Sequence, residues 1–189
     1  MGKQSRKERL GKRLPDREPD EKWYVYILLM RYPDNFSRAV RFFTRMRYSH
    51  ASVGLGGANG TFYSYVIKGF RRELPEKHPT FRQAEVPCRL YKLAVSEKIY
   101  EAVKTALAEH EKQATRYRYT VFGMILSLLR ITYKRKNRYF CSQFVSEMLE
   151  KAQAVPLHKP SARYLPDDFM KMAELELCFT GNMSEMVKG

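Results

Sequence analysis

The sequence contains few cysteines, a single tryptophan and no apolar run of the length that a transmembrane helix needs. Its three cysteines, Cys88, Cys141 and Cys178, are an odd number at wide spacing, which excludes a disulfide framework and a zinc knuckle. A reducing compartment is therefore expected. The charged N-terminus is not followed by the apolar segment of a signal peptide, so we expect a cytoplasmic protein.

Acidic residues are also in the minority. The chain carries 35 Lys and Arg against 20 Asp and Glu, which gives a formal net charge of +15. This balance predicts attraction to a polyanion, either nucleic acid, an anionic membrane face or an acidic substrate, without choosing among them. Hydrophobic residues make up 44% of the chain, which excludes a disordered protein.

A chain of 189 residues corresponds to one domain with tails. Residues 1–22 are polar, lack aromatics and are interpreted as a flexible basic N-terminal arm. We expect the folded domain to cover residues 23–170 and a C-terminal extension to cover 171–189. No internal repeat is visible.

Hydrophobic periodicity predicts a mixed α+β domain. The expected elements are a strand over 23–30, a helix after the turn at 32–35, a β-hairpin over 50–67, an irregular excursion over 68–87, a strand over 89–95, a helix capped by Ser96 and a helix that starts near Cys141. Residues 119–133 are the most apolar stretch and predict a buried helix. Basic residues and tyrosines bracket this stretch, so a helix lying in a membrane interface is the alternative.

Cys141 is the strongest candidate for chemistry. It stands where an extended segment meets an amphipathic helix, and the dipole and free amides of a helix start stabilise a thiolate. The basic residues over 134–138 favour the thiolate as well. A nucleophilic cysteine needs a base. His50 is the best of the four histidines because it alone begins a predicted core strand, whereas His110 is expected on a solvated helix face.

The order of these motifs resembles a known superfamily. The segment SHASVGL around His50, followed much later by YFCSQFVSEML around Cys141, is similar to the circularly permuted branch of the NlpC-type papain-like hydrolases, which includes lecithin–retinol acyltransferase-like enzymes. More narrowly, Tyr48-Ser49-His50, Tyr63-Ser64 and the stretch 139–145 resemble an uncharacterised bacterial family, mostly from Firmicutes. The resemblance covers about residues 23–169. It implies an α+β fold in which an antiparallel sheet packs against helices.

The resemblance also implies catalytic roles, with Cys141 as nucleophile and His50 as base. The strand after His50 lacks the residue that usually orients the base, and Ser64 falls at that position. Ser64 is therefore the candidate orienting residue, and Tyr63, Tyr139 and Arg138 are candidate substrate-binding residues. No metal ligand set and no organic cofactor are expected.

These residues predict a thiol hydrolase or acyltransferase that acts on an amide or ester bond through a thioester. A small-molecule, peptide or lipid acyl group is the expected substrate, and an anionic membrane surface is a candidate partner. The alternative is a catalytically silent papain-like domain that binds an anionic partner, either a membrane surface or nucleic acid. Nucleic acid is the less favoured of the two because no recognised motif is present and the aromatics fall at core periodicity. The sequence carries no signature of oligomeric state.

Overall fold

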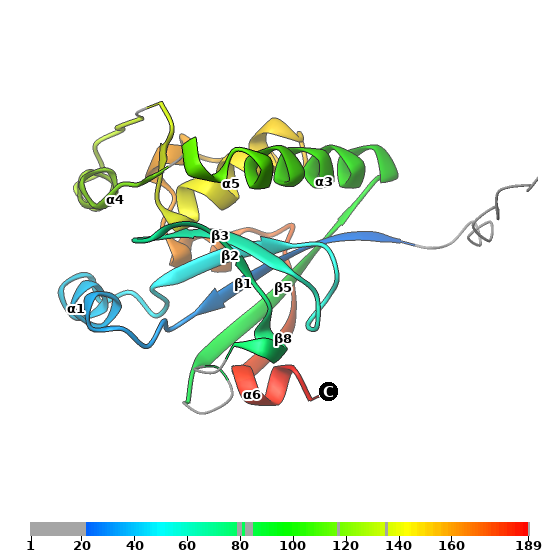
Figure 1. Ribbon diagram of the computed structural model, residues 1–189, viewed down its shortest axis with the longest axis horizontal. Helices are drawn as coiled ribbons and strands as arrows, with labels where there is room; N and C mark the ends of the chain where they lie inside the picture. Colours follow the sequence, from blue (N-terminus) through cyan, green and yellow to red (C-terminus); the bar gives the residue numbers. More distant parts are fainter. Residues whose placement is uncertain (1–21, 79–80, 82–84, 117, 135, 189) are drawn as a thin grey trace, which may run out of the picture.

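β1 (Trp23–Met30) runs through the middle of a six-stranded antiparallel sheet with the order β4-β3-β2-β1-β5-β8 (Figure 1). The computed structural model describes residues 22–78, 81, 85–116, 118–134 and 136–188. The other strands of this sheet are β2 (His50–Gly54), β3 (Phe62–Val66), β4 (Gly69–Glu73), β5 (Pro87–Val95) and β8 (Glu176–Asn182). The short strands β6 (Arg118–Tyr119) and β7 (Arg138–Tyr139) form a separate parallel pair.

The helices are α1 (Asn35–Thr44), α3 (Glu97–Lys112), α4 (Val121–Leu128), α5 (Cys141–Lys151) and α6 (Met183–Met186). The short 3-10 helices in the described part of the chain are η1 (Pro75–Lys77), η2 (Ala114–Arg116), η3 (Ser161–Arg163) and η4 (Pro166–Lys171). The side chains of Asp34, Ser96 and Thr120 cap α1, α3 and α4. Each accepts a hydrogen bond from the backbone N–H of the residue three positions later. Among the described residues, no helix has the length and apolar character needed to cross a membrane.

β1 is apolar throughout because both faces of the sheet are covered. Val25, Ile27 and Leu29 pack in the larger core cluster with α3 and α5, whereas Leu28 and Met30 alternate onto the opposite face with a smaller cluster that includes α6. In Figure 1, α3 and α5 lie above the sheet and α6 lies below it. The expected α+β class, with an antiparallel sheet and helices, is thereby confirmed.

The C-terminal boundary of the domain differs from the prediction. Residues 171–188 are not an extension, because β8 pairs with β5 from Pro87↔Asn182 to Lys92↔Glu176. Met183 and Met186 of α6 are buried in the smaller core cluster. The segment belongs to the domain because it covers an apolar face of the sheet that would otherwise meet water. The predicted N-terminal arm, apart from Lys22, lies outside the described residues.

Two internal segments also differ from the prediction. The excursion over 68–87 contains β4, which pairs with β3 along its whole length. The predicted buried helix over 119–133 is limited to α4, which is eight residues long, and Phe122, Ile125 and Leu129 on or beside it are exposed. His110 is not on a solvated face either, because its side chain is buried at the end of α3.

Candidate active site

Cys141 is the first residue of α5, as the sequence predicts. The preceding residue, Phe140, is extended, and no side chain caps the first amides of the helix. The backbone N–H groups of Ser142 and Ala51 lie close enough to the thiol to help lower its pKa. Amides at a helix start carry partial positive charge, so this position favours a thiolate over a thiol.

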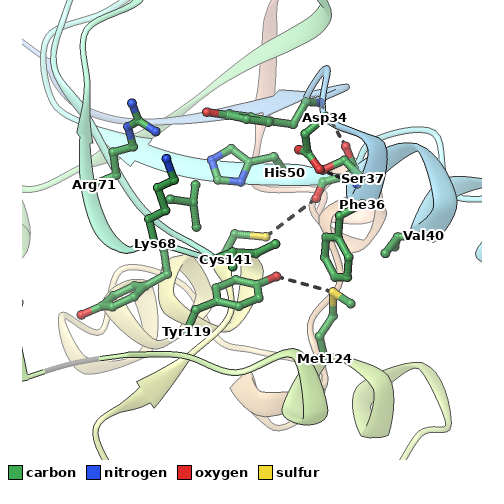
Figure 2. A pocket seen from close by; sticks show the side chains of 15 residues that line it. Asp34, Phe36, Ser37, Val40, His50, Lys68, Arg71, Tyr119, Met124 and Cys141 are labelled. Atoms are coloured by element: carbon green, nitrogen blue, oxygen red, sulfur yellow. Dashed lines mark hydrogen bonds between the residues drawn. The ribbon is translucent and has the colours of Figure 1, made fainter.

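His50 begins β2 and reaches the same point from the sheet (Figure 2). Its imidazole lies beside the Cys141 thiol, close enough for each group to shift the pKa of the other, and the thiol lies 4.0 Å from the carbonyl oxygen of Ser49. Tyr32 packs edge-on against the imidazole, with ring centroids 5.2 Å apart. The structure therefore brings together the nucleophile and base that the sequence predicts.

Glu73, at the end of β4, completes the arrangement. Its Oε1 lies 3.0 Å from Nε2 of His50, which leaves Nδ1 of the imidazole for the thiol. Strand register explains the approach: Glu73 pairs with Phe62 and Phe62 pairs with Gly54, so alternation places Glu73 on the same face of the sheet as His50. Both side chains are buried, with 1% and 5% of their surface exposed.

The pKa values of His50 and Cys141 are both shifted at this site. Burial alone would lower the pKa of His50, but the charge of Glu73 and the hydrogen bonds to Cys141 and Glu73 outweigh it and raise the pKa from 6.5 to about 10. Burial alone would raise the pKa of Cys141, but the hydrogen bond and charge of His50, with the two backbone amides, lower it. The arrangement therefore favours an imidazolium–thiolate pair at neutral pH.

Ser64 does not orient His50. It shares a face of the sheet with the histidine, but its hydroxyl donates a 2.6 Å hydrogen bond to the carbonyl oxygen of Ala51 and is fully buried. The contact predicted for Ser64 is made by Glu73 instead. A carboxylate is the better partner because its charge stabilises the imidazolium, which a neutral hydroxyl does less well.

The candidate binding residues lie away from the thiol. Tyr63 stacks on Phe70, and Tyr139 is buried in the core, where its hydroxyl donates to Glu147. Arg138 lines a neighbouring hollow rather than the one that contains Cys141. Lys134, in the basic segment before α5, pairs with Glu147 at 3.1 Å instead of with the thiol.

A cavity of about 280 Å³ opens over the Cys141 thiol. Phe36 and Val40 of α1 and Met124 of α4 give one wall an apolar lining, and Lys68 and Arg71 lie at the opposite side (Figure 2). The cavity thus combines a reactive thiol, an apolar wall and a cationic edge. Cavities of roughly this size hold small ligands or part of a larger one.

Tyr119 also lines this cavity, and the sequence did not indicate a role for it. Its side chain lies close to Cys141, and its hydroxyl donates to the sulfur of Met124 at 3.6 Å (Figure 2). Burial raises its pKa well above 10, and the negative charge of Cys141 raises it further. Tyr119 therefore stays a neutral hydrogen-bond donor next to the thiol.

Glu73 was missed because its segment has the composition of a loop. The sequence Gly69-Phe-Arg-Arg-Glu73 contains three charges and is followed by Leu74-Pro75, which indicates an irregular segment. The only available signal was a possible strand ending in an acid after the hairpin. No group of three or more His, Cys, Asp or Glu side chains in the described parts of the chain is arranged to hold a metal ion.

Comparisons with known proteins do not add to this picture: no protein-family model, curated protein or solved structure matches the chain.

Proposed function

We propose that the protein is a cysteine-dependent acyl hydrolase or acyltransferase of the circularly permuted papain-like, NlpC-type kind. The proposal rests on three buried side chains, Cys141, His50 and Glu73, which lie next to one another in this order beneath a cavity. A thiol activated by an imidazole, itself oriented by a third group, is the arrangement used by thiol hydrolases. The strand with the base precedes the helix with the nucleophile in the chain, which is the order of the permuted branch.

The reaction proceeds through a thioester. The Cys141 thiolate attacks the carbonyl carbon of an ester or amide, and the carbonyl oxygen becomes an oxyanion. We assign the backbone N–H of Cys141 as a donor to this oxygen, and the hydroxyl of Tyr119 can serve as a second donor only by leaving its hydrogen bond to the sulfur of Met124. The carbon–leaving-group bond then breaks, and the His50 imidazolium gives its proton to the departing alcohol or amine.

The second half restores the enzyme. His50, now neutral, takes a proton from water or from an acceptor nucleophile, which attacks the thioester carbonyl carbon. The thioester bond breaks, Cys141 leaves as thiolate, and His50 is again an imidazolium next to Glu73. Water gives a carboxylic acid, and an alcohol or amine acceptor gives a new ester or amide.

The cavity favours an acyl group with an apolar chain. Phe36, Val40 and Met124 offer it an apolar wall, and Lys68 and Arg71 can meet a negative group elsewhere on the substrate. A lipid or an acylated small molecule fits this lining better than a polar peptide does. No metal and no organic cofactor take part in the proposed steps.

The test is the pH profile of iodoacetamide labelling at Cys141, located by peptide mass. Cys178 is exposed and serves as the reference thiol within the same molecule, since burial raises its pKa rather than lowering it. Cys141 should label well below pH 8, where Cys178 does not, and His50→Ala should remove this difference. Equal labelling of the two thiols, unaffected by His50→Ala, contradicts the proposal and leaves a domain that only binds an anionic partner.

A further inference from the structure

α1 exposes two large aromatic side chains next to each other. Phe42 and Phe43 are 80% and 82% exposed. They lie at the C-terminal end of α1, beyond Phe36 and Val40, which line the cavity. Adjacent phenylalanines left in water cost free energy that a partner surface would recover.

α4 and the residues after it expose further apolar side chains. They are Phe122, Ile125, Leu129 and Ile131, each at least 45% exposed. Met124 and Ser127 of the same helix are buried, so α4 is amphipathic with its more apolar side outward. The outward positions of a surface helix are ordinarily polar, but those of α4 and of the residues just after it are apolar, which indicates an interfacial surface.

The two helices belong to one side of the molecule. Figure 1 shows α1 and α4 at the same end of the sheet, with the strand ends between them. A hollow is lined jointly by Phe43 of α1 and Met46 beyond it and by Leu128 of α4 and Arg130 beyond it. The cavity over Cys141 is lined by both helices as well. We call this surface the α1–α4 face; it consists of Phe42, Phe43, Phe122, Ile125, Leu129 and Ile131 with the arginines described next.

Arginines surround the exposed phenylalanines. Arg31, Arg38 and Arg41 line a shallow hollow together with Phe42 and Phe43. Within the described residues, none of these arginines forms an ion pair. Their like charges repel one another. Burial, followed by the charges of Arg31 and Arg38, lowers the pKa of Arg41.

The acids near this face are already engaged. Asp34 caps α1 through its hydrogen bond from the backbone N–H of Ser37, and Asp168 pairs with Lys159 at 2.6 Å. Asp167 accepts hydrogen bonds from the backbone amides of Arg47 and Tyr48. The α1–α4 face therefore presents apolar side chains and uncompensated positive charge together.

We propose that the α1–α4 face docks on the surface of a lipid bilayer that contains anionic headgroups. The apolar side chains enter the boundary between headgroups and acyl chains, and the arginines meet the phosphates. Docking in this orientation brings the bilayer next to α1 and α4, the two helices whose side chains line the Cys141 cavity.

Charge and side-chain type favour a bilayer over other partners. A two-fold contact between copies of the chain would bring the same arginines face to face, and their repulsion disfavours it. Single-stranded nucleic acid needs aromatic rings for base stacking, whereas Ile125, Leu129 and Ile131 are aliphatic. An anionic bilayer complements both the charge and the aliphatic side chains.

The experiment is co-sedimentation of the full chain with vesicles of pure phosphatidylcholine and with vesicles in which a third of the lipid is phosphatidylglycerol. We expect binding to the anionic vesicles alone. The variant Phe42→Ser with Phe43→Ser removes the aromatic pair, and Leu177→Ser, an exposed apolar residue on β8 at the far edge of the sheet, is its control. The aromatic variant should lose binding by tenfold or more, and the control should not.

A second pair of variants tests the charge. Arg31→Gln with Arg38→Gln should weaken binding by roughly fivefold for each arginine, because both are exposed arginines of the α1–α4 face. Lys98→Gln with Lys112→Gln, both exposed on α3, removes the same charge elsewhere and should weaken it far less. Far-UV circular dichroism confirms that each variant is folded. If the Phe42/Phe43 variant is not folded, Ile125→Ser with Leu129→Ser gives a second test of the apolar side chains.

Several outcomes would overturn the proposal. They are the absence of binding to anionic vesicles, binding that these variants leave unchanged, a dimer that dissociates in the aromatic variant while vesicles are ignored, and binding of an oligonucleotide but not of vesicles. Vesicle binding does not need the thiol, so Cys141→Ala should bind as the wild type does. Docking and catalysis can thus fail independently of each other.

Discussion

Glu73 influences the protonation of the His50–Cys141 pair, although it contacts only His50. Its Oε1 holds Nε2 of His50, while its Oε2 is buried without a hydrogen-bond partner among the described atoms. A buried carboxylate that is only half satisfied costs stability, and it is tolerated where it stabilises a charge. At this site, the charge is the imidazolium that accompanies the Cys141 thiolate.

Glu73→Gln should therefore weaken the thiolate without removing the histidine. The amide can still contact Nε2, but it carries no charge, so the pKa of His50 falls and that of Cys141 rises. One pKa unit corresponds to a tenfold change in the thiolate fraction, and we expect labelling of Cys141 at pH 7 to slow by roughly that factor or more. Glu76→Gln, an exposed acid three residues along, is the matched control and should leave the labelling profile in place.

Ser64→Ala should separate stability from reactivity. The substitution removes the buried hydrogen bond from Ser64 to the carbonyl oxygen of Ala51 and should lower the free energy of unfolding by about 1 kcal/mol. The pH profile of Cys141 labelling should stay as in the wild type, because Glu73 rather than Ser64 contacts His50. Urea denaturation and thiol labelling of the same sample measure the two effects. A shifted labelling profile would restore the orienting role to Ser64.

At the scale of elements, the sequence predicts the strands and helices whose apolar residues follow a regular pattern. Alternating or continuous apolar residues located β1, β2, β3 and β5, and helical spacing located α1, α3 and α5. The ordering of His50 on a strand before Cys141 at a helix start was therefore available from sequence. Both are the first residues of their elements in the structure, but the meeting of the two side chains depends on how α5 packs on the sheet, which periodicity does not encode.

The missed elements are those whose pattern is set by tertiary contacts. β4 has the charged composition of a loop, and only its pairing with β3 turns Glu73 inward. β8 has exposed residues over most of its length and forms because β5 offers an unpaired edge. α4 is too apolar to look like a surface helix, and the sequence cannot show that its apolar side faces outward.

At the scale of the whole molecule, the candidate site joins segments that are far apart in the chain. His50 and Glu73 come from the first half, and Cys141 comes from the second, so the site exists only when α5 is packed on the sheet. Phe144, Val145 and Met148 of α5 anchor this packing in the larger core cluster. His110 of α3 lies against the same cluster, close to Tyr65 and Phe144.

His110 links the stability of this packing to pH. Burial, followed by the charge of Lys151, lowers its pKa from 6.5 to about 4, while Glu147 opposes the shift. The folded protein therefore keeps His110 neutral at pH values where the unfolded chain is protonated. Because the unfolded state binds more protons between pH 6.5 and pH 4, protonation pulls the equilibrium toward unfolding as the pH falls through this window.

The variant His110→Phe should remove this part of the acid destabilisation. A phenyl ring can keep the contacts with Phe70, Tyr139 and Phe144, and it has no proton to gain. Relative to pH 7, the wild type should lose roughly 2 kcal/mol more stability at pH 4 than the variant, after allowance for solvent screening. Urea denaturation of both proteins at a series of pH values measures this difference. Because both proteins contain His50, Cys141 and Glu147, the contributions of these groups cancel when the two stability curves are subtracted. Parallel stability curves for the two proteins between pH 6.5 and pH 4 would show that His110 is not held neutral by the fold.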